Sequence, residues 1–209
     1  MKRLLRNAGS VMMCLVFCLL CIMHSTPASA DAGRWEKELS GPVEIEGAGV
    51  FPTNGACDTA TDWNVALKYT AGGVRLNFRG IPPGEWRRRY AKTGDHGTAF
   101  EGAEGWVHVK RGYIDANPKS LLQSQIGPDE IQLYKSNDHV RNFLDCVKSR
   151  GQTISGIDTA VKVDTVCHLS DIATQLELRL TWDPKHERFT NNDTANRLLV
   201  RAMRSPWHL

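Results

Sequence analysis

Residues 63–78 read WNVALKYTAGGVRLNF, and this stretch contains the clearest strand signal of the chain. Apolar and polar residues alternate on both sides of its centre, as they do in strands that bury one face. The centre, residues 71–73, contains two glycines, which adopt the positive φ of a tight hairpin turn without steric cost. The stretch therefore predicts two antiparallel strands joined by a hairpin.

The same alternation is found on either side of this hairpin, at residues 43–46 and at residues 106–110. Glycine or proline separates these short runs, which is typical of consecutive antiparallel strands. The region 42–112 is therefore expected to form an antiparallel meander. The alternation breaks between residues 80 and 97, where IPPGEWRRRY is followed by polar residues, and this segment predicts a long loop.

From residue 137 the hydrophobic period becomes that of helices. Asn137 or Asp138 can cap a first helix that ends at Arg150 and Gly151. The apolar positions of this helix recur every three or four residues: Val140, Phe143, Leu144 and Val147. A second helix is expected to begin at residues 155–158 and to run to residue 176 or 180, and a short third helix is expected over residues 193–200.

The N-terminus has the order of a secretory signal. Basic residues at positions 2, 3 and 6 precede an apolar run over residues 11–23, and small residues precede Asp31. The run would span about 20 Å as a helix, which is shorter than the roughly 30 Å hydrocarbon core, so we expect no stable membrane anchor. The sequence predicts a signal peptide (1–30) cleaved after Ala30, a linker (31–40), one domain (41–209), and export to the periplasm or the medium.

Removal of the signal would change the charge and cysteine counts. The chain has 26 basic and 23 acidic residues, and the first thirty residues hold three basic and no acidic ones. The remainder is therefore balanced, and no net charge attracts it to nucleic acid. Cys57, Cys146 and Cys167 remain. The last two lie in helical patterns, where a small buried side chain and a disulfide between Cys146 and Cys167 are the two alternatives.

Candidate ligand-binding residues gather in the expected loop. A sugar or an anionic ligand would find guanidinium groups, an aromatic face and an imidazole there, and a solvated surface segment is the alternative. The residues are Trp86, Arg87, Arg88, Arg89 and His96, and Tyr90 beside the arginines would supply a second aromatic face. His139 is a further candidate, because it would approach His168 if the two long helices pack as a hairpin. Glu101 and Glu104 are interpreted as turn residues whose carboxylates point to water.

Several stretches together resemble one enzyme family. They are residues 41–47, 100–107, 118–122, 138–150, 167–173, 182–184 and 195–207. Their order and spacing are similar to those of the C-terminal half of the glucose-fructose oxidoreductase, inositol dehydrogenase and rhizopine-catabolism (Gfo/Idh/MocA) oxidoreductases. The resemblance implies an α+β domain, with an open mixed or antiparallel sheet and helices packed on one face. In that family this half lines the substrate pocket, and its exposed sheet face commonly joins subunits.

The resemblance also limits the expected function. Full-length members begin with a Rossmann domain that holds NAD(P), and no glycine-rich dinucleotide motif occurs in this sequence. No catalytic, cofactor-binding or metal-binding residue is therefore assigned. We expect a noncatalytic exported module that binds a sugar or polyol or assembles subunits, as a homo-oligomer through the open sheet face or with a full-length relative. The alternative is a remnant or split half of an NAD(P)-dependent sugar or polyol oxidoreductase that needs a separate Rossmann partner.

Overall fold

The computed structural model describes residues 41–69, 73–90, 96–125, 127–129, 134–200 and 204–206. The expected signal peptide and linker, residues 1–40, lie outside the described residues. The described residues up to Gly80 and from Asp164 onward form one compact unit, and Ile81–Val163 form a second. The two units are described in turn.

The first unit contains a five-stranded sheet in the order β3-β2-β1-β7-β8. Its strands are β1 (Glu44–Val50), β2 (Asp62–Lys68), β3 (Arg75–Arg79), β7 (Arg179–Asp183) and β8 (Arg188–Phe189). The register places Ile45 opposite Leu67 on one side and opposite Leu180 on the other. All described pairings are antiparallel, so the meander over β1 to β3 is confirmed and no described pair makes the sheet mixed.

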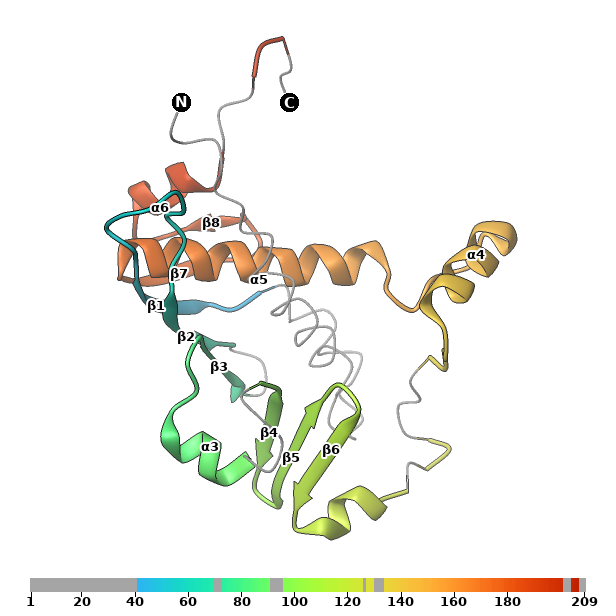
Figure 1. Cartoon of the computed structure of the whole chain (residues 1–209). Coiled ribbons are helices and arrows are strands. Elements are labelled where there is room, and N and C mark those ends of the chain that lie inside the picture. Colours follow the sequence, from blue (N-terminus) through green and yellow to red (C-terminus); the bar gives the residue numbers. More distant parts are fainter. Residues whose placement is uncertain are drawn as a thin grey trace. The chain divides into compact units, whose positions relative to one another are not determined.

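Helix α5 (Ile157–Leu176) covers one face of this sheet with its C-terminal turns (Figure 1). Its buried apolar residues there are Val166, Cys167, Leu169, Ile172 and Ala173. The helix approaches β1 at Gly47, where a Cβ atom would lie 2.6 Å from the backbone nitrogen of Thr174. The buried hydroxyl groups of Ser170 and Thr174 donate to the carbonyls one turn earlier, so these polar side chains are satisfied inside the core.

The chain leaves α5 earlier than residue 180, the later of the two ends that the sequence predicts. Glu177 has a φ of 53°, which is the left-handed conformation that ends a helix. Strand β7 follows, and its alternation buries Leu180 and Trp182. Trp182 contacts Phe189 of β8 edge to face at 5.1 Å, and this contact closes the sheet at its β8 end.

The last helix of the first unit, α6 (Asp193–Leu198), confirms the short helix expected near the C-terminus. Asn192 caps it by accepting a hydrogen bond from the backbone nitrogen of Ala195 at 2.8 Å. The Asn196 amide accepts from the Phe189 backbone nitrogen and donates to the Phe189 carbonyl. These two bonds tie α6 to β8.

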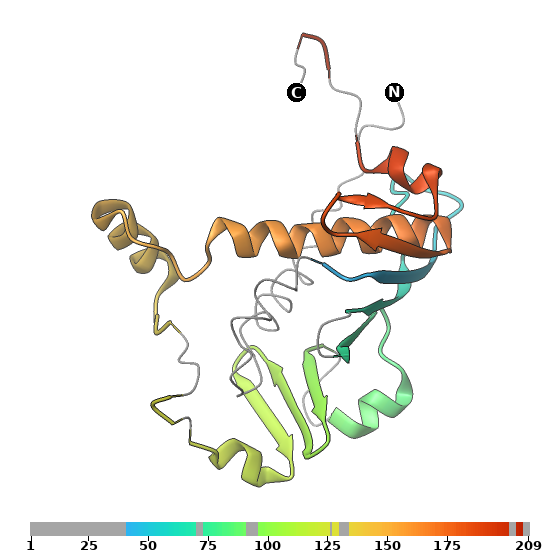
Figure 2. The same ribbon diagram turned by 180° about the vertical axis from the view of Figure 1, so that it is seen from behind.

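The second unit contains a three-stranded antiparallel sheet in the order β4-β5-β6. Its elements are α3 (Gly84–Tyr90), β4 (Thr98–Gly102), β5 (Gly105–Lys110), β6 (Tyr113–Asn117), the 3₁₀ helix η3 (Lys119–Gln123) and α4 (His139–Ser149). Helix α3 lies beside β4 in both views (Figures 1 and 2). The region expected to be one meander is therefore divided between two sheets.

Helix α3 corrects the prediction of a long loop between residues 80 and 97. The backbone nitrogen of Arg87 donates to the carbonyl of Pro83 at 3.1 Å, which forms the first helical turn. Glu85 lies in the first turn and three arginines lie in the last turn, and both complement the helix dipole. Proline before a helix is compatible with its start, because the first positions need no intrahelical donor.

Helix α4 and the cysteines agree with the sequence pattern. Asp138 caps α4 through a 2.8 Å bond to the backbone nitrogen of Arg141, and Arg150 ends the helix in the left-handed conformation. Cys146 and Cys167 are both buried and are free thiols, so the alternative of a buried side chain describes them and no disulfide joins them in the structure. Among the described residues, no helix combines the length and apolar character needed to span a membrane.

Candidate functional site

The polar face of the three-stranded sheet is the candidate site. Alternate residues of β5 share a face, so Trp106 and His108 point to the same side. The register pairs Trp106 with Glu101 of β4 and pairs His108 with Asp115 of β6. Two aromatic side chains and two carboxylates are therefore brought together by backbone pairing alone.

Tyr90, the last residue of α3, covers this face. Its ring stacks on the His108 imidazole with centroids 5.5 Å apart and planes 10° apart. It also meets the Trp106 ring edge to face at 5.1 Å. The Tyr90 hydroxyl donates to Glu101, and the Arg89 guanidinium lies 3.0 Å from the same carboxylate oxygen. We call Arg89, Tyr90, Glu101, Trp106 and His108 the aromatic cluster.

The electrostatics of the aromatic cluster favour neutral rings. Burial lowers the pKa of His108, and the nearby charges of Lys110 and His96 lower it further, against the opposing effect of Asp115. Burial and the hydrogen bond to Glu101 raise the pKa of Tyr90 to about 12. At neutral pH the cluster thus presents an uncharged imidazole and an uncharged phenol beside an ion pair that is half exposed.

A second carboxylate borders the cluster. Asp115 is buried and accepts hydrogen bonds from the backbone nitrogen of Ala116 and from the Tyr113 hydroxyl. It also pairs with Lys119 of η3, and the hydrogen bond from Lys119 is the main reason that the pKa of Asp115 is lowered. The lysine therefore holds this carboxylate charged and fixed at the edge of the sheet.

Of the predicted candidates, the structure brings Arg89 into the aromatic cluster. Helix α3 carries Trp86, Arg87, Arg88 and Arg89, and Arg89 belongs to the aromatic cluster. His96 lies close enough to His108 to affect its pKa. His139 is the exposed first residue of α4, and α4 contributes no residue to the aromatic cluster. Glu104 lies exposed in the turn between β4 and β5, as the sequence predicts. Glu101 is half exposed at the end of β4, but its carboxylate does not face water alone, because Tyr90 and Arg89 both bind it.

Three members of the cluster were not predicted as site residues: Glu101, Trp106 and His108. The signal of the last two was present in the alternation of Trp106, His108 and Lys110 along one strand, which places all three on one face. Tyr90 was predicted as an aromatic face beside the arginines, but within a loop, and a loop assigns no face to a side chain. Among the described residues, no group of three or more His, Cys, Asp or Glu side chains could hold a metal ion.

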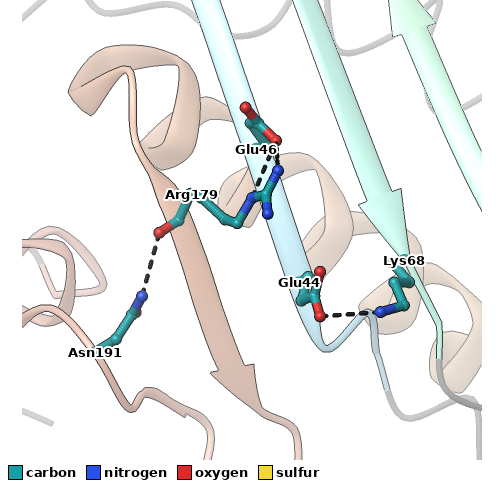
Figure 3. Close-up of polar contacts among 5 residues, drawn as sticks. All are labelled: Glu44, Glu46, Lys68, Arg179 and Asn191. Atoms are coloured by element: carbon teal, nitrogen blue, oxygen red, sulfur yellow. Dashed lines mark hydrogen bonds and ion pairs between the residues drawn. The ribbon is translucent and has the colours of Figure 1, made fainter.

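The open face of the five-stranded sheet is a second polar region (Figure 3). Glu44 binds Lys68 at 3.1 Å, and Glu46 accepts two bonds from the Arg179 guanidinium, at 2.8 and 3.2 Å. The pKa of Arg179 is raised, mainly by its hydrogen bond to Glu46. Asn191 donates to the Arg179 carbonyl at 3.2 Å. The charges of this face are therefore paired within the chain, and as exposed pairs they contribute little to stability.

The fold and the site define a domain of mixed α/β class, made of antiparallel sheets and helices, with aromatic and charged side chains gathered on one sheet face. Residues 94–209, more than half of the chain, match the family described as "Oxidoreductase family, C-terminal alpha/beta domain" (GFO_IDH_MocA_C2). The chain belongs to this family, and the resemblance drawn from the sequence is confirmed over these residues. No curated protein and no solved structure matches the chain.

Burial of His108 predicts a stability that falls in acid. Because burial lowers the pKa of His108 in the fold, the unfolded chain binds a proton that the folded chain does not, once the pH falls below about 6.5. The contribution of neutral His108 to the free energy of unfolding is therefore fully present above that pH. It decreases below that pH, until the pH reaches the lowered pKa of His108 in the folded protein. We expect urea unfolding of the wild type to shift to lower midpoints between pH 7.5 and 5.5, and His108→Gln to show a smaller shift. Equal shifts would contradict the assignment of this acid sensitivity to His108.

Proposed function

We propose that this chain is an exported, noncatalytic module that binds a sugar or polyol at the aromatic cluster. The observation that carries the proposal is the position of Tyr90, which lies against both Trp106 and His108 while its hydroxyl binds Glu101. Aromatic faces contact the C–H faces of sugar rings, and the carboxylate and guanidinium groups beside them exchange hydrogen bonds with hydroxyl groups. The cluster combines these two kinds of contact within one small sheet.

The charges of α3 support the same assignment. Arg89 is half exposed although it pairs with Glu101, so its guanidinium retains donors that can reach a ligand hydroxyl. Trp86 is half-buried on the same helix and adds a second indole near the arginines. The proposal assigns to this chain no bound nucleotide, because its sequence contains no glycine-rich dinucleotide motif. It also assigns no catalytic residue, because the bound cofactor supplies the hydride in an oxidoreductase of this kind.

Tryptophan fluorescence tests the proposed binding. Trp106 belongs to the cluster, so titration with D-glucose, D-glucitol and D-glucuronate should give a saturable change in emission with at least one of them. Tyr90→Ala should weaken this binding at least tenfold, which corresponds to about 1.4 kcal/mol, because the ring that covers the site is lost. Tyr90→Phe keeps the ring and loses only the bond to Glu101, so it should weaken binding less.

The control for this test is Tyr134→Ala, which removes an exposed tyrosine of the same unit outside the cluster and should leave the affinity unchanged. If a folded wild type gives no saturable change with any of the three compounds, the sugar-binding proposal is abandoned. NAD and NADP should give no saturation either. A micromolar dissociation constant for NAD or NADP would overturn the noncatalytic assignment.

A further inference from the structure

The polar face of the three-stranded sheet continues beyond the aromatic cluster, toward the turn between β5 and β6. Trp106, His108 and Lys110 alternate along β5, so their side chains lie on the same face. The register places Asp115 of β6 opposite His108 and places Tyr113 opposite Lys110. Directly opposite residues of antiparallel strands share a face. Lys110 and Tyr113 therefore extend the polar face beyond His108 by about 7 Å along the strand.

The ammonium group of Lys110 is held in place by an aromatic ring and not by a carboxylate. Its Nζ atom lies 5.8 Å from the centroid of the Tyr113 ring, within the range of a cation–π contact. Lys110 is itself half-buried. Within the part of the chain that the structure describes, no carboxylate lies at ion-pair distance from this ammonium group. The ring therefore positions the charge of Lys110 without neutralising it.

The carboxylates of the same face are already paired. Asp115 binds Lys119, and Glu101 binds Arg89. A tyrosine hydroxyl also donates to each of these two carboxylates. The described side chains of this face thus include three cations, Arg89, Lys110 and Lys119, against two carboxylates. One positive charge is in excess, and it is the charge of Lys110.

The electrostatics at His108 agree with this excess of positive charge. The charge of Lys110 lowers the pKa of His108 and the charge of Asp115 raises it, and the effect of Lys110 is the larger of the two. The nearby His96 lowers the pKa of His108 as well. Positive charge therefore outweighs negative charge at this imidazole, although Asp115 lies directly opposite. A positive potential beside uncharged aromatic rings attracts an anionic ligand more than a neutral one.

The excess of one positive charge matches a ligand group with one negative charge. A carboxylate carries a single negative charge and accepts hydrogen bonds from the donors of an ammonium group. A phosphate monoester carries close to two negative charges at neutral pH, and one unpaired ammonium group would leave part of that charge uncompensated. We propose that Lys110 binds the carboxylate of a sugar acid, such as a hexuronate, whose ring lies at the aromatic cluster. This inference rests on the sugar-binding function proposed above and narrows the ligand to acidic sugars.

Fluorescence titration with an acidic and a neutral sugar tests this inference. The wild type should bind D-glucuronate about tenfold more tightly than D-glucose, because a charge-assisted hydrogen bond is added. Lys110→Gln should remove most of this preference, whereas Lys110→Arg, which keeps the charge, should retain it. Addition of NaCl should also lower the preference of the wild type, because salt screens a charge that is only half-buried. The matched control is Lys148→Gln, at an exposed lysine of α4 in the same unit, and it should keep the preference of the wild type.

The outcomes separate this inference from the sugar-binding proposal. If D-glucose or D-glucitol binds and D-glucuronate binds no more tightly, the carboxylate site at Lys110 is overturned and the sugar-binding proposal stands. If none of the three compounds binds to the folded wild type, both proposals fail. A preference that persists in folded Lys110→Gln, or that salt leaves unchanged, would overturn the assignment of the carboxylate to Lys110. Tighter binding of D-glucose 6-phosphate than of D-glucuronate would overturn it as well, because the site would then accept a phosphate.

Discussion

Replacing Gly47 with alanine should destabilise the unit of the five-stranded sheet by about 3 kcal/mol, close to the upper end of what overpacking costs. The added Cβ atom would lie 2.6 Å from the Thr174 backbone nitrogen and 2.9 Å from the Ala173 carbonyl carbon. Neither atom can move without shifting α5 away from β1. A loss of this size should lower the melting temperature of the unit by about 15 °C.

Variants at neighbouring positions separate this backbone clash from other effects. Ala48→Val adds more volume at the next residue of β1, but Ala48 is exposed on the opposite face, so stability should hardly change. Thr174→Ala removes the hydroxyl that would also contact the new methyl group, yet it leaves the backbone nitrogen in place. The double variant Gly47→Ala with Thr174→Ala should therefore remain unstable. Recovery of stability in that double variant would show that the clash is only with the side chain.

The location of the damage can be measured by hydrogen exchange. Gly47→Ala should increase deuterium uptake in peptides from residues 44–50 and 164–176, which belong to its own unit. Uptake in peptides from residues 98–117 should stay close to that of the wild type, because they belong to the other compact unit. Equal loss of protection in both units would mean that the chain unfolds as one cooperative body.

Much of the first unit could be predicted from periodicity. The strands β1 to β3 bury alternate residues, so their period of two is visible in the sequence. The ends of α4 were readable because Asp138 is a capping residue and Gly151 signals a helix stop, although the left-handed conformation falls one residue earlier, on Arg150. The transition from α5 to β7 was not readable in the same way. It depends on the positive φ of Glu177, and glutamate does not signal that conformation.

The candidate site was only half visible in the sequence. Trp86 and the three arginines are adjacent in the chain, so their cluster was found at once. The residues that complete the site come from β4 and β5, and they reach Tyr90 only through strand pairing. Residues 81–90 were taken for a loop because Pro82 and Pro83 interrupt the strand pattern. In the structure the same prolines precede a helix, and that helix brings Tyr90 to the sheet.

The second large effect is expected at Gly105, the first residue of β5. Its φ is +141°, and an added Cβ atom would lie 2.1 Å from the carbonyl oxygen of Asn117 in the neighbouring strand. Gly105→Ala therefore combines backbone strain with a clash that no side-chain movement relieves. We expect a loss of about 3 kcal/mol in the three-stranded sheet, with increased deuterium uptake in residues 98–117 and little change in residues 44–50.

Substitutions at two other glycines, one in β4 and one in the turn between β5 and β6, separate the effect of backbone strain from that of the steric clash. Gly112 has a φ of +73° with no atom within 4 Å of its Cβ position, so Gly112→Ala reports the strain alone and should cost about 1 kcal/mol. Gly102, which pairs with Gly105 across the turn, has open space and no positive φ, so Gly102→Ala should change stability little. If Gly105→Ala lowers the free energy of unfolding no more than Gly112→Ala does, the clash with the Asn117 carbonyl has no cost. The start of β5 and the end of β6 would then move apart without loss of stability. Because Trp106 follows Gly105 directly, a large cost should come with weakened sugar binding, whereas Gly112→Ala should leave binding intact.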